Sequence, residues 1–111
     1  RPVYFHVRRG EQGRWTMVHV LGEIDLATAP QYRSELIAAA SASTALAIDL
    51  TDCDLIDSVG LGVTVGGARR MWGAGGQFAV VTNDRIRRTF ERCRLDEILD
   101  LVDAPEALPA A

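Results

Sequence analysis

The chain has 111 residues, 48% of them hydrophobic and 24% charged, values typical of one folded domain with a single core. Its formal net charge is −3, so nucleic acid is not an expected partner, and no apolar run approaches the roughly 18 residues that cross a bilayer, so we expect no direct membrane insertion. No signal peptide is visible, and because the chain starts at Arg1 rather than Met, we expect that residues before Arg1 have been removed.

The N-terminal part of the chain predicts a β-hairpin. Residues 3–8 alternate between apolar and polar side chains, with Val3, Phe5 and Val7 on one face, and residues 15–21 alternate again. The glycine-containing segment 10–13 between them predicts the turn. His6 and His19 fall on these strand patterns, and we interpret both as surface or cross-strand residues.

A helix is predicted over residues 28–41. Thr28 is a favoured N-cap residue, Pro30 fits the first turn and Gln31 would complete a capping box. Apolar residues at helical spacing indicate the buried face, namely Tyr32, Leu36 and either Ala39 or Ala40.

The next strand and helix surround the most informative segment. Residues 45–50 form a short apolar run, typical of a buried central strand, and residues 51–54 are predicted to be an acidic loop. A second helix should run from Ser58 or Val59 to Trp72. Its predicted inward face consists of Leu61, Val65, Ala68 and Trp72.

The last third of the chain continues the alternation of strands and helices. Residues 77–81 predict a strand, and residues 84–93 predict a helix that buries Ile86, Phe90 and Cys93. Residues 95–101 predict a short turn or helix followed by a short strand, and a weak helix is expected after Pro105.

This order indicates an α/β fold with a mixed sheet of four to five strands, which starts with a hairpin and carries helices mainly on one face. The organisation expected is a single domain over residues 1–111, with its core at about residues 3–103 and a tail or short helix at 104–111.

Ser58 is the residue that points most directly to function. A hydroxyl at the start of a helix lies among free backbone N–H groups, which favour negative charge, so Ser58 is a suitable position for a phosphate. The alternative is that Ser58 only caps the helix, as serine and aspartate both do; Asp57 could also be the cap while Ser58 points outward.

Glycines are unusually frequent in the helix after Ser58. Gly62, Gly66 and Gly67 each cost roughly 0.5–1 kcal/mol relative to alanine inside a helix. Either the helix packs closely on its own sheet, or its surface is flat so that a partner can lie against it; we favour the second, with Arg69 beside that surface.

Three segments resemble the signatures of the STAS domain family. Residues 22–30 (GEIDLATAP) are similar to the first signature, residues 57–62 (DSVGLG) to the second and residues 87–96 (RRTFERCRLD) to the third, in the expected order. Within that family the chain most resembles bacterial anti-sigma factor antagonists.

The resemblance implies a cytoplasmic switch in transcription regulation. Ser58 would be phosphorylated by an anti-sigma factor that is itself a serine kinase, a metal-dependent serine phosphatase would reverse this, and only the unphosphorylated chain would bind the kinase and free the sigma factor. The resemblance also places Asp25 near the serine loop. The residues we expect to contact the partner are Glu23, Asp25, Asp57, Ser58, Val59, Gly60, Gly62, Gly66 and Arg69.

Several alternatives remain at this stage. The family usually has Ser or Thr where this chain has Val59, which could weaken kinase recognition or pack against the sheet. That departure motivates a second function, a STAS subunit that docks on a transporter or sensory assembly without a phosphorylation cycle. Glu23 and Asp25 could also be simple turn residues.

Enzyme chemistry is not expected. Ser58 lacks the spacing of a hydrolase nucleophile elbow, and the chain has no lysine to complete a phosphate-binding loop. Cys53 and Cys93 match no metal-ligand or redox spacing, so we expect no metal and no cofactor, and two isolated thiols fit a reducing cytoplasm.

Overall fold

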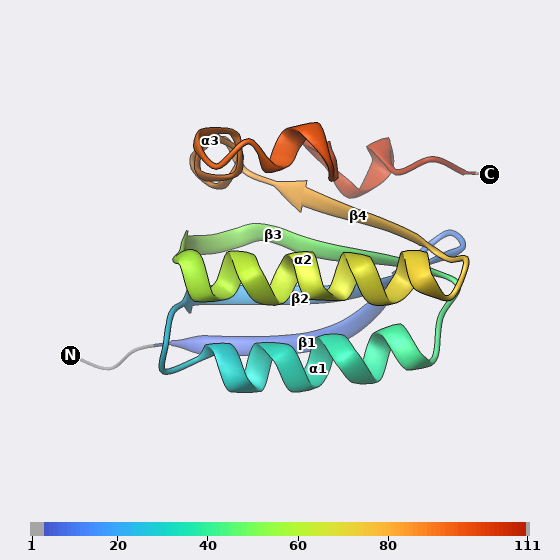
Figure 1. Ribbon diagram of the computed structural model, residues 1–111, viewed down its shortest axis with the longest axis horizontal. Helices are drawn as coiled ribbons and strands as arrows, with labels where there is room; N and C mark the ends of the chain where they lie inside the picture. The colour runs from blue at the N-terminus through green and yellow to red at the C-terminus, as the bar shows by residue number, and fades with distance from the viewer. Residues whose placement is uncertain (1–3, 111) are drawn as a thin grey trace.

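The structure, a computed structural model, describes residues 4–110, which form one five-stranded sheet and three α-helices (Figure 1). The elements in chain order are β1 (Phe5–Gln12), β2 (Trp15–Ile24), α1 (Ala29–Ser41), β3 (Ala45–Ile56), α2 (Ser58–Gly73), β4 (Gln77–Thr82), α3 (Asp84–Arg92), a 3-10 turn (Leu95–Glu97), β5 (Asp100–Val102) and a second 3-10 turn (Pro105–Ala107).

The sheet is mixed and follows the chain order. Strands β1 and β2 pair antiparallel, whereas β2–β3, β3–β4 and β4–β5 are parallel. The α/β class, the initial hairpin and the five-stranded upper bound of the prediction are confirmed. The hairpin turn is shorter than predicted, because β1 continues through Gly10 to Gln12 and only Gly13 and Arg14 connect it to β2. Gly13 has a φ of 57°, which glycine adopts readily.

The helix-facing side of the sheet holds the larger core. Phe5 and Val7 of β1 pack on it as predicted, whereas the prediction for Val3 lies outside the described residues. Tyr32, Leu36, Ala39 and Ala40 of α1 are all buried, which confirms the face predicted for that helix. Figure 1 shows α1 and α2 side by side over the sheet, with α3 on the far side of α2 from α1. No helix within residues 4–110 has the length and apolar character needed to cross a membrane.

Strand β3 is longer than its sequence suggests. The predicted loop 51–54 is wrong, because β3 continues to Ile56 and pairs with the second half of β2. Asp52 pairs with Leu21 of β2, and Asp54 lies at an irregularity between the Cys53 and Leu55 pairs, while Cys53 and Ile56 remain buried. The register shifts twice in this region, between His19 and Leu21 and between Gly22 and Glu23.

The inward face of α2 is rotated from the one predicted. Leu61 and Ala68 are buried and Val65 is partly buried, but Trp72 is 43% exposed, so its assignment to the core was wrong. Four residues absent from the predicted face are buried instead, Gly60, Thr64, Gly67 and Met71. The prediction missed this face because it followed only large apolar residues, whereas the helix approaches α1 through a glycine and a threonine.

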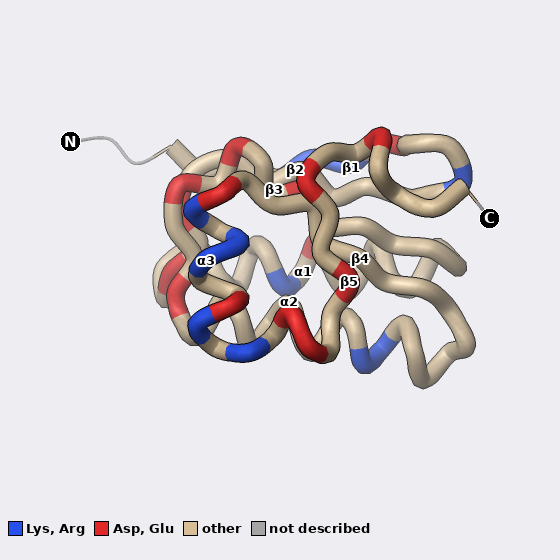
Figure 2. Tube along the Cα trace, turned by 90° about the horizontal axis from the view of Figure 1, so that it is seen from above, with Lys and Arg blue, Asp and Glu red and all other residues tan. Residues whose placement is uncertain are grey.

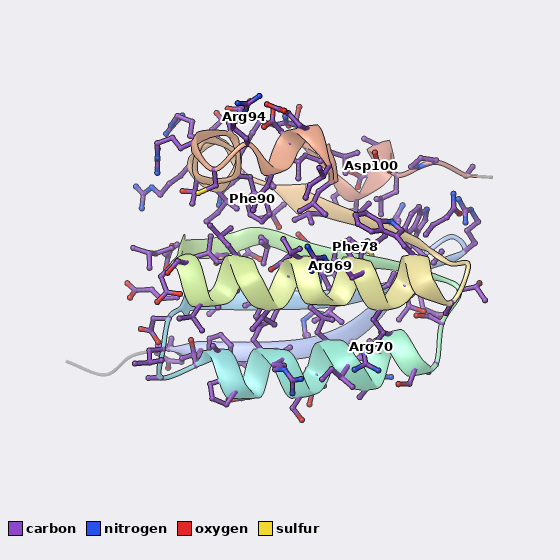
Figure 3. The ribbon with its side chains drawn as sticks, in the orientation of Figure 1. Arg69, Arg70, Phe78, Phe90, Arg94 and Asp100 are labelled. Carbon is purple, nitrogen blue, oxygen red and sulfur yellow. The ribbon has the colours of Figure 1, made fainter. Side chains whose placement is uncertain are left out.

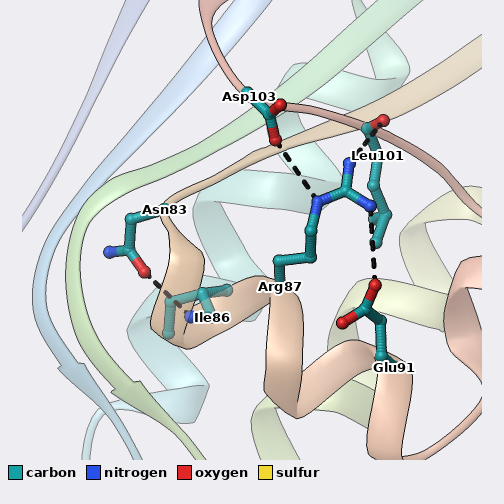
Figure 4. Close-up of polar contacts among 6 residues, drawn as sticks. All are labelled: Asn83, Ile86, Arg87, Glu91, Leu101 and Asp103. Atoms are coloured by element: carbon teal, nitrogen blue, oxygen red, sulfur yellow. Dashed lines mark hydrogen bonds and ion pairs between the residues drawn. The ribbon is translucent and has the colours of Figure 1, made fainter.

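Helix α3 is fixed to two strands by polar contacts (Figure 4). The Asn83 side chain accepts a hydrogen bond from the Ile86 amide at 2.8 Å and donates to the Cys53 carbonyl at 3.0 Å. The Arg87 guanidinium donates to the Leu101 carbonyl at 3.1 Å and to Asp103 at 3.3 Å. Figure 2 shows that positively charged residues are frequent along α3, interspersed with acidic ones. These contacts attach the third sequence signature to β3 and the end of β5.

The two cysteines have different environments, which corrects the prediction that Cys93 is buried. Cys53 is buried and Cys93 is exposed. Burial raises the pKa of the Cys53 thiol to about 11. This protects Cys53 from alkylating reagents such as iodoacetamide, because these react with the thiolate and not with the neutral thiol. At pH 8 only about one Cys53 in a thousand is ionised. We expect rapid alkylation of Cys93 alone in the native chain and of both thiols in urea, measured by intact mass; modification of Cys53 at the rate of Cys93 would contradict the structure.

The second face of the sheet is covered by the C-terminal segment. Trp15, Met17, Ala47 and Val81 form a smaller apolar cluster there, and Leu108 packs into it. The Trp15 indole donates a hydrogen bond to the Pro109 carbonyl at 2.7 Å. Residues 104–110 were expected to be a tail or short helix; they contain the short 3-10 turn and also complete this second cluster.

Candidate functional site

The site lies where β2 and β3 end side by side. Ile24 pairs with Ile56, so the residues that follow them, Asp25 and Asp57, start adjacent connections at the same edge of the sheet. The Asp57 amide donates to the Ile24 carbonyl at 3.0 Å, which joins the two connections directly. The parallel pairing therefore brings the first and second signatures together, although they are about 30 residues apart in the sequence.

Asp57, and not Ser58, caps α2. The Asp57 carboxylate accepts a hydrogen bond from the Gly60 amide at 3.0 Å, and its backbone is extended, as an N-cap residue requires. Ser58 is the first helical residue and is exposed. The helix start is thus satisfied by aspartate, and the Ser58 hydroxyl does not have to serve as its cap.

The loop before α1 is held by Asp25. Its carboxylate accepts from the Ala27 amide at 3.0 Å and the Thr28 amide at 3.1 Å. The Thr28 hydroxyl donates to the Glu23 carbonyl at 2.8 Å and accepts from the Asp25 amide at 2.9 Å. The predicted capping box with Gln31 is wrong, because Thr28 makes no side-chain cap hydrogen bond. Asp25 does have the turn role that was considered for it, and it remains half-buried beside Asp57.

The glycines of α2 divide into two groups with different structural roles. A Cβ at Gly60 would come within 2.6 Å of the Ile24 side chain, and one at Gly67 within 2.3 Å of Leu36, so both allow close packing inside the protein. Gly60 is buried, and its expected contact with a partner is therefore wrong. A Cβ at Gly62 or Gly66 would meet nothing within 4 Å, so these two leave the outer surface of α2 open.

This division predicts opposite effects for two nearby substitutions. Gly60→Ala should lower the free energy of unfolding by about 1–3 kcal/mol, because the β-branched Ile24 and Ile56 leave no room for a methyl group. Gly62→Ala should raise it by about 0.5–1 kcal/mol, because alanine favours the helix and meets no neighbour. Urea unfolding followed by circular dichroism measures both; shifts of the same sign would show that the glycines share one role.

An open groove runs between α1 and α2 from this edge. Its first part, about 440 Å³, is mostly apolar and is lined by Leu26, Ala29, Pro30, Arg33, Ser34, Ile37, Val59 and Val63. Its second part, about 340 Å³, shares Arg33, Ile37, Val59 and Val63 and adds Gly62, Gly66 and Arg70. We call this surface the α1–α2 groove. The sequence reasoning missed its α1 side, and the available signal was Leu26, an apolar residue within a polar turn.

The structure shows where Val59 and Arg69 lie, which the sequence analysis had not determined. Val59 is 41% exposed and lines the groove. Arg69 is exposed, but eleven residues of helix separate it from Ser58, a rise of about 16 Å. In Figure 3 Arg70 extends towards α1, and Arg69 leaves α2 on another side. Arg69 is therefore on the outer surface of α2 without being beside Ser58.

The histidines lie far from Ser58. His19 contacts the buried Asp49 at 2.8 Å, in the middle of β3. Seven residues of extended strand separate Asp49 from Ile56, a distance of about 23 Å. His6 and His19 instead line a shallow surface hollow with Arg8 and Asp52. The structure does not bring a general base from either histidine to the Ser58 hydroxyl.

Known proteins resemble this chain over three quarters or more of its length. The anti-sigma-B factor antagonist of Bacillus subtilis is 35% identical over 85 residues, which cover 76% of this chain and 78% of that protein. The anti-sigma-B factor antagonist of Listeria monocytogenes is 34% identical over 86 residues, 76% of this chain and 75% of that protein. The crystal structure of an anti-sigma factor antagonist from Mycobacterium paratuberculosis has a TM-score of 0.85 at 27% identity and covers 94% of this chain and 90% of its own.

The family assignment follows from these matches. The sequence model of the STAS domain matches residues 7–107, a segment that includes most of β1, strands β2 to β5, all three α-helices and the 3-10 turn Pro105–Ala107. This chain belongs to the STAS domain family.

Proposed function

We propose that this chain is an anti-sigma factor antagonist, which binds an anti-sigma factor serine kinase while Ser58 is unphosphorylated and so releases a sigma factor. The names of its relatives support this function. The observation that carries it is the start of α2, where Asp57 provides the cap and Ser58 remains exposed at the first helical position. A kinase therefore has access to the hydroxyl without first breaking the helix.

The start of α2 is also suited to holding the phosphate. The first amides of a helix and its dipole stabilise negative charge, so a phosphate on Ser58 should leave the fold intact. In a complex the same phosphate would be covered next to Asp57 and Asp25, and this combination of desolvation and repulsion would release the partner. The modification would thus act on the interface and not on folding.

The proposed partner surface surrounds this helix start and extends along α2. The half-buried Glu23, Asp25 and Asp57 provide negative charge, the exposed Ser58 and Val59 lie at its centre, and Gly62, Gly66 and the more distant Arg69 continue it along α2. The domain would be a substrate of the kinase and of a serine phosphatase rather than a catalyst, and both enzymes would meet it in the cytoplasm.

The decisive experiment is phosphorylation in vitro. The purified chain is incubated with ATP and each anti-sigma factor kinase of its organism in turn, and intact mass and peptide mapping follow. We expect one phosphate on Ser58 and none in Ser58→Ala. An unmodified chain beside a kinase that phosphorylates another substrate would refute the cycle and favour a STAS subunit that docks on a larger assembly.

A further inference from the structure

The first part of the α1–α2 groove is an exposed apolar surface that the fold itself does not use. Leu26 is 74% exposed and Val59 is 41% exposed at its entrance. Along α2 its floor is formed by Gly62 and Gly66, beside which a Cβ would meet nothing within 4 Å. Adjacent exposed apolar side chains around a hollow are typical of a surface that another molecule covers.

The groove also has unmatched charge. Arg33 lines both of its parts and Arg70 lines the second. None of the ion pairs formed among residues 4–110 involves Arg33 or Arg70. The entrance, by contrast, lies next to Asp25 and Asp57. An occupant that complements the surface is therefore apolar where it faces the first part of the groove, and it carries carboxylate groups opposite Arg33, near the entrance, and opposite Arg70, farther along α2.

The groove continues directly from the proposed kinase-binding surface. Leu26 follows Asp25 in the chain, and Val59 follows Ser58. A protein that covers Ser58 will also meet the entrance of the groove. A small ligand fits the geometry less well, because binding pockets usually enclose most of their ligand, whereas this groove is open above Gly62 and Gly66.

We infer that the α1–α2 groove binds an amphipathic helix of the anti-sigma factor kinase, whose apolar face covers Leu26, Ile37 and Val59 and whose acidic residues pair with Arg33 and Arg70. The inference rests on the proposed function and extends it. Ser58 is then the switch at one end of the interface, and the groove provides affinity and partner selection along the rest.

Charge reversal tests the polar half of this contact. In R33E/R70E two attractive pairs become repulsive, so the affinity for the kinase that modifies Ser58 should fall roughly tenfold or more, measured by calorimetry with the unphosphorylated chain. The matched control is R88E/R92E, which makes the same change on exposed residues of α3, on the other side of α2 from the groove. The control should bind like the wild type.

Filling the groove tests the apolar half. Gly66→Leu places a side chain into open space on the groove floor, so the chain should fold and melt at no lower temperature than the wild type. Its affinity for the kinase should nevertheless fall roughly tenfold or more, because the added side chain occupies the space of the partner helix.

The outcomes separate this inference from the function on which it rests. If Ser58→Glu lowers the affinity for the kinase while R33E/R70E and Gly66→Leu both bind like the wild type, the groove inference is overturned and the proposed function stands. If Ser58→Glu has no effect, the proposed function fails and the inference fails with it. Saturable binding of oleate that requires Arg33 and Arg70, with kinase affinity unchanged in the groove variants, would identify the groove as a small-molecule site and also overturn the inference.

Discussion

Ser58→Glu is expected to lower the affinity for the anti-sigma factor kinase by about 30- to 150-fold, equivalent to about 2–3 kcal/mol. The new carboxylate must be desolvated in the interface beside Asp57 and Asp25, which start adjacent connections at the same edge of the sheet. Because Asp57 already caps α2, the substitution removes no hydrogen bond that holds the helix start. Calorimetric titration of the kinase with both chains measures the difference.

Two controls isolate the position of the charge. Ser58→Ala should bind the kinase like the wild type, because the free hydroxyl is not required for the cap. Ala74→Glu adds the same charge at the opposite end of α2 and should also leave binding unchanged. Thermal unfolding of Ser58→Glu should match the wild type, since negative charge is favourable at a helix N-terminus. Equal loss of affinity in Ala74→Glu would show that net charge, and not the Ser58 position, controls binding.

Leu108→Asp is expected to destabilise the protein by about 2–4 kcal/mol and to lower its melting temperature by about 10 °C. Leu108 is 8% exposed and packs on Trp15 and Met17, on the face of the sheet opposite the helices. An aspartate will not remain in that apolar cluster, so the C-terminal segment should leave the sheet and expose Trp15 to water. Calorimetry measures the loss of stability.

Tryptophan fluorescence reports the same event locally. Trp15 is 3% exposed and donates to the Pro109 carbonyl, whereas Trp72 is 43% exposed in the native fold. A red shift of the emission in native Leu108→Asp would therefore come from Trp15. Ala110→Asp places the same charge on an exposed residue of the same segment and should change neither stability nor emission. Wild-type stability in Leu108→Asp would mean that the segment does not hold the second cluster.

Local patterns were sufficient for most of the elements. Alternation predicted the two hairpin strands, helical spacing predicted the buried side of α1, and the apolar run after residue 76 predicted β4. The acidic end of β3 could not be predicted in this way. Asp52 and Asp54 are typical of a loop, and they lie in a strand only because β2 is long enough to pair with Asp52 and with the residues on either side of Asp54.

Leu108 and Trp72 illustrate the same limit of prediction from local patterns. Residues 104–110 contain a single large apolar side chain and no periodic pattern that would predict a packing role, yet Leu108 completes a core cluster with Trp15, which is more than 90 residues away in the sequence. Trp72 has the opposite character, an aromatic residue at helical spacing that lies outside the core. In both cases the decision depends on what the opposing surface provides, and that surface is assembled from distant segments.

The candidate site shows what the local sequence and the folded structure each contribute. Local sequence was sufficient to identify Ser58 as the residue of interest, Asp57 as a possible cap and the family to which the three signatures belong. The folded structure was needed to establish that Asp57 is the cap, that Gly60 and Gly67 are packing residues while Gly62 and Gly66 are open, and that α1 and α2 form a groove beside Ser58. The physical reason is that a side chain's chemistry is local, whereas its burial and its neighbours are set by strand pairing and helix packing between segments far apart in the chain.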